Sequence, residues 1–130
     1  MRVHTVVALS ACFAAAFAAG SATSATARSS EEAASLVLTV SGSASTTEAT
    51  LSCEPTGGTH VQAAEACRAL IGVGGEFGAL DVAPDTNCPA IYDPVRATAR
   101  GVWAGTVVSY DREFGNSCEL GARTGPVFAF

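Results

Sequence analysis

Residues that could perform catalytic chemistry are few in this sequence. The chain has two histidines, His4 and His60, and no serine lies in a G-x-S-x-G sequence, so no nucleophile is paired with a base. We expect His60 to be a solvent-exposed residue at the start of a helix. No zinc-ligand pattern, P-loop or dinucleotide fingerprint is present, so we expect no metal and no cofactor. No pair of carboxylates stands out for glycoside chemistry. This pattern favours a binding function over an enzyme.

The thiols are the other reactive side chains. The chain holds five cysteines, of which Cys12 lies in an apolar N-terminal stretch that we expect to be removed. The remaining four are Cys53, Cys67, Cys88 and Cys118. An even number in a small secreted chain predicts two disulfides, and three pairings are open. The pairing of sequence neighbours, 53 with 67 and 88 with 118, would contribute about 3 and roughly 3.7 kcal/mol on the loop-entropy model.

One segment combines a cysteine with two prolines: residues Asn87 to Pro94, with the sequence NCPAIYDP. Each proline has φ fixed near about −65° and keeps the preceding residue out of the α region, so the segment should be extended and stiff. A disulfide through Cys88 would tether its start. An exposed, extended, tethered segment is the form in which a protease cleft binds a peptide as an added β-strand. The alternative is an ordinary structural loop with a disulfide at its base.

Strands are predicted before and after this segment. Residues 35–41 and 48–53 predict an antiparallel pair, and the alternation places Leu36, Leu38 and Val40 on one face. Val37 is then the odd apolar residue on the more polar face. Residues 95–110 predict a second hairpin around an Ala104-Gly105 turn.

A helix is predicted between the two hairpins. Thr59 and Gln62 have the spacing of a capping box, although the helix could begin a few residues later, and Gly74-Gly75 should end it. Apolar residues recur at helical spacing and place Cys67 on the buried face. The irregular acidic connection that follows has two apolar anchors, Phe77 and Leu80.

The C-terminal part adds a turn or short helix over residues 111–121, which carries Cys118, and an apolar last strand at Pro126–Phe130. The predicted fold class is therefore α+β. It comprises an antiparallel sheet of about five strands, one main and one short helix, and two disulfides.

The first 27 residues have the features of a secretory signal, with an apolar Ala-rich run and the cleavage signature Ala25-Thr26-Ala27. The run is too short to span a membrane. In an alternative interpretation, Leu9 to Cys12 resembles a lipobox and Cys12 is acylated. We expect residues 28–34 to be a flexible arm, residues 35–130 to be the domain, and the protein to be secreted and extracellular.

The mature chain should be acidic. After loss of a leader that carries Arg2, six of the seven basic residues remain against twelve acidic residues. Nucleic acids and anionic membranes are bound by basic surfaces, so we expect neither as a partner.

Several motifs, in the same order along the chain, resemble those of the Streptomyces subtilisin inhibitor family. They are CPAIYDPV at 88–95, Gly101-Val102-Trp103-x-Gly105, Val108-Ser109-Tyr110, Cys118-Glu119 and VFAF at 127–130, together with SLVLTV at 35–40 and Val73-Gly74-Gly75. The resemblance covers about residue 35 to the end.

The resemblance implies a secreted inhibitor of subtilisin-like serine proteases, with an antiparallel sheet, two helices and the disulfides Cys53–Cys67 and Cys88–Cys118. The bond presented to the protease would lie between Ala90 and Ile91. The contact segment would include five further residues, Asn87, Cys88, Pro89, Tyr92 and Asp93.

The resemblance also implies a homodimer joined through sheet faces, and Val37 is the residue that we expect there. This sequence departs from the family at Ala90, where Met or Lys is common. Two other hypotheses remain: an extracellular structural or binding module, and, with less support, a small secreted hydrolase with a carboxylate-based site.

Overall fold

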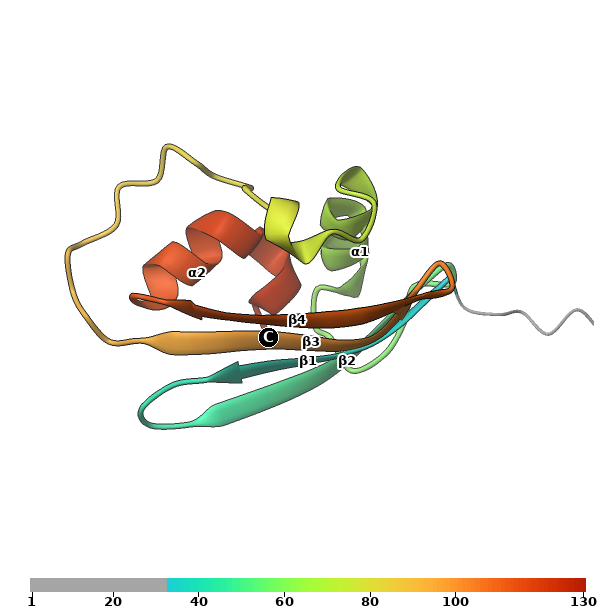
Figure 1. The fold of residues 1–130 in the computed structure, drawn as a ribbon, viewed down its shortest axis with the longest axis horizontal. Coiled ribbons are helices and arrows are strands. Elements are labelled where there is room, and N and C mark those ends of the chain that lie inside the picture. The colour runs from blue at the N-terminus through green and yellow to red at the C-terminus, as the bar shows by residue number, and fades with distance from the viewer. Residues whose placement is uncertain (1–32) are drawn as a thin grey trace, which may run out of the picture.

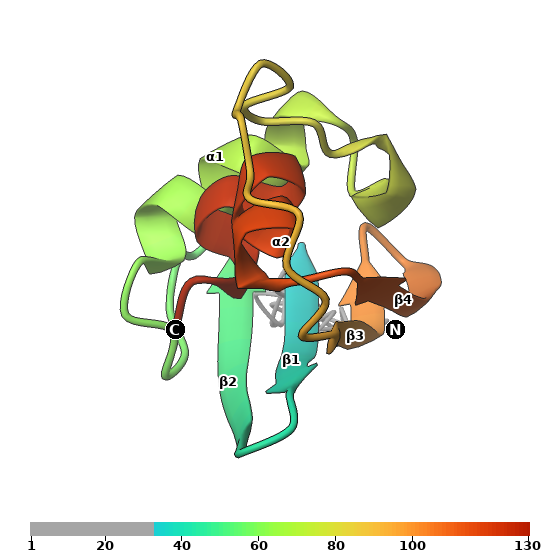
Figure 2. The ribbon, with the colours of Figure 1, turned by 90° about the vertical axis from the view of Figure 1, so that its left-hand side faces the viewer.

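Four strands form one antiparallel sheet in the order β2-β1-β3-β4, and the helices cover one of its faces (Figures 1 and 2). The computed structural model describes residues 33–130, so the predicted signal at 1–27 and the arm up to residue 32 lie outside the described residues. The strands are β1 (Ala34–Ser41), β2 (Thr46–Cys53), β3 (Val95–Trp103) and β4 (Thr106–Phe114). The helices are α1 (Ala63–Gly72) and α2 (Ser117–Thr124), with two short 3-10 helices, η1 (Phe77–Ala79) and η2 (Gly125–Phe128).

Both predicted hairpins are confirmed, and β1 pairs with β3 to join them. Leu36 and Leu38 of β1 are buried against the helical layer, whereas Val37 points to the uncovered face and is 39% exposed. The alternation predicted from the sequence is therefore correct. β1 begins at Ala34, one residue earlier than expected, because Ala34 is buried and pairs with both Cys53 and Trp103. Ala34 belongs to the sheet and not to the arm.

The core lies between the sheet and the helical layer. Phe77 and Leu80, the predicted anchors of the connection after α1, are both buried. The Phe77 ring lies 5.3 Å from that of Tyr110 on β4 and 6.0 Å from that of Phe128 in η2. These aromatic contacts join the connection, the sheet and the C-terminal segment. α1 ends as predicted, with Gly74 and Gly75 at positive φ.

The predicted last strand at 126–130 is wrong. Gly125 has a φ of 53°, and residues 125–128 form the 3-10 helix η2 instead. Pro126 at its start lacks a backbone N–H, and its fixed φ suits a helical turn. Val127 and Phe128 are nevertheless buried, so the apolar C-terminus packs in the helical layer and not at a sheet edge. The sheet consequently has four strands and not about five.

The prediction that His60 is solvent-exposed at a helix start is also wrong, because His60 is only 5% exposed. Its Nε2–H donates to the carbonyl of Val127 (3.0 Å), and its Nδ1 accepts from the backbone N–H of Gln62 (3.0 Å). Thr59 does not cap α1: its hydroxyl accepts from the backbone N–H of Thr50 on β2 (2.9 Å), and α1 begins at Ala63 without a side-chain cap. His60 thus links η2 to the residues that precede α1.

Candidate functional site

The segment from Asn87 to Pro94 forms the exposed end of the molecule before β3 (Figure 1). It has no regular secondary structure, and Pro89 and Pro94 restrict the backbone angles of the residues before them. Ala90 is exposed, and Ile91 and Tyr92 are 61% and 80% exposed. Apolar side chains of this size are usually buried, so three exposed ones in succession are a feature of a binding surface.

A disulfide holds the start of this segment. Cys88 is bonded to Cys118 in the first turn of α2, and the other bond joins Cys53 to Cys67 on α1. Both pairings are those that the resemblance implied. Figure 2 shows the segment running down in front of α2 before it enters β3. The segment therefore lies over a helix that is itself packed on the sheet.

Asn116 supports the centre of the segment from behind. This side chain is 6% exposed, and its Oδ1 accepts from the backbone N–H of Glu119 (3.0 Å), which makes it the N-cap of α2. Its Nδ2 donates to the carbonyls of Pro89 (3.2 Å) and Ile91 (2.8 Å). The carbonyls on either side of Ala90 are thus held by one amide, whereas among residues 33–130 the Ala90 carbonyl forms no hydrogen bond.

The end of the segment is also held by hydrogen bonds. The backbone N–H of Asp93 donates to the carbonyl of Gly115 (2.9 Å), which adjoins Asn116. The carboxylate of Asp93 accepts from the hydroxyl of Ser43 (3.2 Å) in the turn between β1 and β2. Segments before and after Ala90–Ile91 are therefore attached to the fold independently of that bond.

The predicted contact residues thus lie together, while two other predicted residues do not join them. Val37 lies on the uncovered sheet face, and His60 is buried beside η2. Asn116 was missed by the sequence reasoning. The sequence Asn116-Ser117-Cys118-Glu119 matches an N-cap followed by a Glu three residues later, so its role at the helix start could have been recognised. Its bonds to residues 89 and 91 have no signal in the sequence.

No group of three or more His, Cys, Asp or Glu side chains placed to hold a metal ion occurs within residues 33–130. In the same part of the chain, no helix is long and apolar enough to cross a bilayer.

Comparisons with known proteins agree with this geometry. The sequence profile of the family described as subtilisin inhibitor-like matches residues 32–116. Subtilisin inhibitor-like protein 4 of Streptomyces lavendulae is 56% identical over 82 residues, which cover 62% of this chain and 71% of that protein. Subtilisin inhibitor of Streptomyces albogriseolus is 48% identical over 102 residues, which cover 73% of this chain and 71% of that protein.

A solved structure is similar as well. The crystal structure of Streptomyces caespitosus sermetstatin, in complex with Bacillus licheniformis subtilisin, superposes with a TM-score of 0.58 at 37% identity. The match covers 75% of this chain and 98% of sermetstatin. The resemblance drawn from the sequence motifs is confirmed, and the chain belongs to the subtilisin inhibitor-like family.

Proposed function

We propose that this protein is a secreted, substrate-like inhibitor of subtilisin-type serine proteases and that Ala90–Ile91 is its reactive bond. One observation carries the proposal: an exposed segment without regular secondary structure is hydrogen-bonded from behind at residues 89 and 91, while the Ala90 carbonyl forms no hydrogen bond within residues 33–130. A serine protease must reach the carbonyl of the scissile bond with its nucleophile and its oxyanion hole. These hydrogen bonds hold the carbonyls of Pro89 and Ile91 and leave the Ala90 carbonyl available to the protease.

Binding would follow β-strand addition, in which the backbone before Ala90 pairs with the edge of the protease cleft. The side chain of Ala90 would enter the primary specificity pocket. Because Asn116, Cys88–Cys118 and the two prolines already order the segment, docking costs little further conformational entropy. This preorganisation separates an inhibitor from a flexible substrate of the same sequence.

Resistance to turnover would follow from the attachments on both sides of the reactive bond. If Ala90–Ile91 is cut, Cys88 remains bonded to α2, and Asp93 remains bonded to Gly115 and Ser43. The Asn116 amide can still hold residues 89 and 91 close together. The new amine therefore stays near the acyl group, and religation competes with release.

The names of the relatives support an inhibitor over a secreted hydrolase, and sermetstatin supports a subtilisin-like enzyme as the partner. Ala90 presents only a methyl group, so we infer weaker binding to deep apolar pockets and a relative preference for proteases with small pockets. We also infer secretion through a signal at residues 1–27, which lie outside the described residues.

We further propose a homodimer through the uncovered sheet face. Val37, Val102 and Val107 lie on this face with exposures of 39%, 41% and 78%, and Val102 pairs with Val107. At the other end of the face Arg96 forms a bidentate pair with Asp111 (2.7 Å for both contacts), which lowers the pKa of the Asp111 carboxyl. A self-complementary contact would cover the apolar end and leave the charged pair at the rim.

The test is a titration of a subtilisin-type protease with the purified mature protein, followed by mass spectrometry of the complex at equilibrium. Stoichiometric loss of protease activity and a single slow cleavage at Ala90–Ile91 are expected. An Ala90→Pro variant should not inhibit, because proline cannot supply the backbone N–H that strand pairing uses. The control is Ala129→Gly, at an exposed position outside the segment, which should inhibit as the wild type does. Unchanged protease activity at a large excess of inhibitor would favour the structural-module hypothesis.

A further inference from the structure

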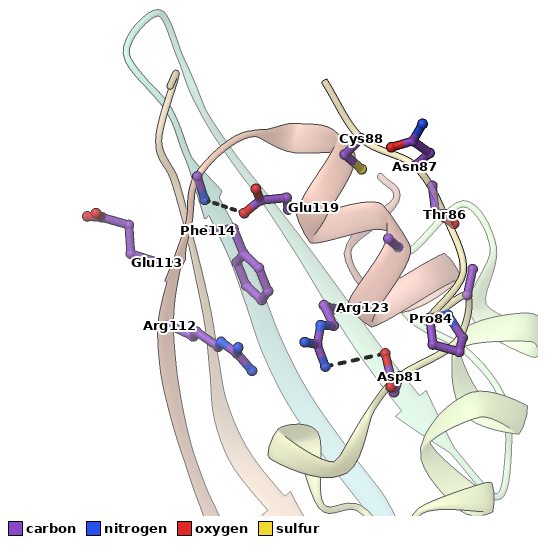
Figure 3. Close-up of a pocket in the computed structure, with 13 residues that line it drawn as sticks. Asp81, Pro84, Thr86, Asn87, Cys88, Arg112, Glu113, Phe114, Glu119 and Arg123 are labelled. Carbon is purple, nitrogen blue, oxygen red and sulfur yellow. Dashed lines mark hydrogen bonds and ion pairs between the residues drawn. The ribbon is translucent and has the colours of Figure 1, made fainter. Parts of the chain in front are cut away.

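A cavity of about 470 Å³ lies behind the start of the contact segment, between residues 81–88, the end of β4 and the outer side of α2. Its volume falls within the range of roughly 300–1,000 Å³ that is usual for small-molecule sites. Charged side chains from all three walls line it, including two arginines, Arg112 from β4 and Arg123 from α2 (Figure 3). Neither arginine has a role in the inhibition proposed above.

Arg112 lies on the inner face of the sheet, where its strand neighbours on that face are Tyr110 and Phe114. Its guanidinium stacks over the Phe114 ring at 5.0 Å from the centroid. Within residues 33–130, no carboxylate oxygen lies within salt-bridge distance of it. Burial raises the pKa of the Tyr110 phenol, and the nearby Arg112 charge opposes that rise. Among the described residues, Arg112 is thus a cation stacked on an aromatic ring without an ionic partner.

Arg123 reaches the same space from the opposite wall. Figure 3 shows its guanidinium and that of Arg112 pointing toward one another below the Phe114 ring. Within residues 33–130 its one ionic contact is to Asp81, through a single nitrogen at 3.4 Å, so most of its five donors are not used by that contact. Because both guanidinium groups line the same cavity, an anion bound in it would be attracted by two positive charges.

The acidic residues around the cavity do not place a carboxylate between the two arginines. Glu119 directs its carboxylate to the backbone N–H of Gly115 (3.0 Å) at the other end of the cavity. Glu113 points away from the cavity in Figure 3, in keeping with the alternation along β4. Asp81 lies on the far side of Arg123 from Arg112.

We propose that Arg112 and Arg123 form a binding site for a small oxyanion, of the phosphate or carboxylate type, in the cavity between β4 and α2. Guanidinium groups bind such anions through paired N–H donors, and the planar Arg112 fork is already oriented by its stacking on Phe114. The anion would link the sheet to α2 and the 81–88 segment, which carries Thr86 and Asn87 at the cavity wall.

The test is a titration of the ¹⁵N-labelled protein with inorganic phosphate, and separately with succinate, at constant ionic strength set by sodium chloride. The Nε–Hε signals of Arg112 and Arg123 should shift together and saturate, with one dissociation constant for both. The signal of Arg68, an exposed arginine of α1 outside the cavity, should not move with them. Saturation by phosphate alone would indicate a tetrahedral anion, and saturation by both probes a site for oxyanions in general.

Variants test the same proposal. Arg112→Gln and Arg123→Gln should each weaken binding by roughly tenfold or more, the loss expected when a charge-assisted contact is removed. Arg68→Gln removes the same charge elsewhere and should leave the dissociation constant unchanged. Shifts that stay linear, or that are equal at all arginines, would overturn the proposal, as would wild-type binding by both cavity variants. The titration contains no protease, so its outcome is independent of the proposed inhibition.

Discussion

The amide of Asn116 offers the sharpest test of how the contact segment is held. In an Asn116→Asp variant, Oδ1 can still accept from the Glu119 N–H and cap α2. The Nδ2 donor is replaced by an oxygen, so both bonds to the carbonyls of Pro89 and Ile91 are lost. The carboxylate oxygen also faces two carbonyl oxygens in a site that is 6% exposed. The segment should therefore lose its central support while α2 keeps its cap.

The size of the effect follows from the two lost hydrogen bonds. Each neutral bond contributes about 0.5–1.5 kcal/mol net, so the two together restrain the segment by about 1–3 kcal/mol. Binding must then supply the ordering that the free protein no longer provides. Because 1.4 kcal/mol is a factor of ten, the inhibition constant should rise roughly 5- to 150-fold. Cleavage at Ala90–Ile91 should become faster, since the new ends are no longer held together.

The assay is the inhibition constant against a subtilisin-type protease, with the rate of cleavage followed by mass. Thr124→Val is the matched control, because Thr124 donates a buried hydrogen bond to the carbonyl of Leu120 within α2 and its side chain forms no hydrogen bond to residues 87–94. It should lower the melting temperature without changing inhibition. The reasoning is refuted if Asn116→Asp inhibits as the wild type does, or if Thr124→Val weakens inhibition equally.

Three further predictions concern the segment and the uncovered face. Ala90→Leu adds three carbons to the pocket-facing side chain, which should improve binding to subtilisin-type enzymes by about 2 kcal/mol, or roughly thirtyfold in affinity. Ala90→Lys should add trypsin inhibition. An identical ranking of proteases for Ala, Leu and Lys at this position would contradict the site assignment. The double variant Cys88→Ser/Cys118→Ser removes a disulfide loop closure that contributes roughly 3.7 kcal/mol, and it should convert the inhibitor into a substrate. Incubation with protease followed by mass analysis would detect the cleavage. An intact protein with wild-type inhibition would count against this prediction. Sedimentation at micromolar concentration should give a dimer for the wild type and a monomer for Val37→Asp. The control is Val61→Asp, which changes an exposed valine outside the sheet and should remain a dimer. A monomeric wild type would exclude the dimer.

Much of the fold was predictable because its signals are local. The alternation along residues 35–41 identified which side chains of β1 face the helices, and Gly74-Gly75 marked the end of α1. The same local reasoning failed at residues 126–130, where apolar composition indicated a strand. Strand formation needs a neighbouring edge to pair with, and in this fold the segment packs in the helical layer as η2 instead.

Sequence alone predicted a restricted backbone for the contact segment, because Pro89 and Pro94 restrict their own φ and the residues before them through steric contacts between chain neighbours. It also predicted two disulfides from the cysteine count. Only the tertiary structure decided what holds the segment. Asn116 reaches carbonyls that lie 27 and 25 residues earlier in the chain, and His60 reaches one that lies 67 residues later. Such bonds depend on how the sheet and the helices bring distant segments together, so no spacing or composition within either segment predicts them.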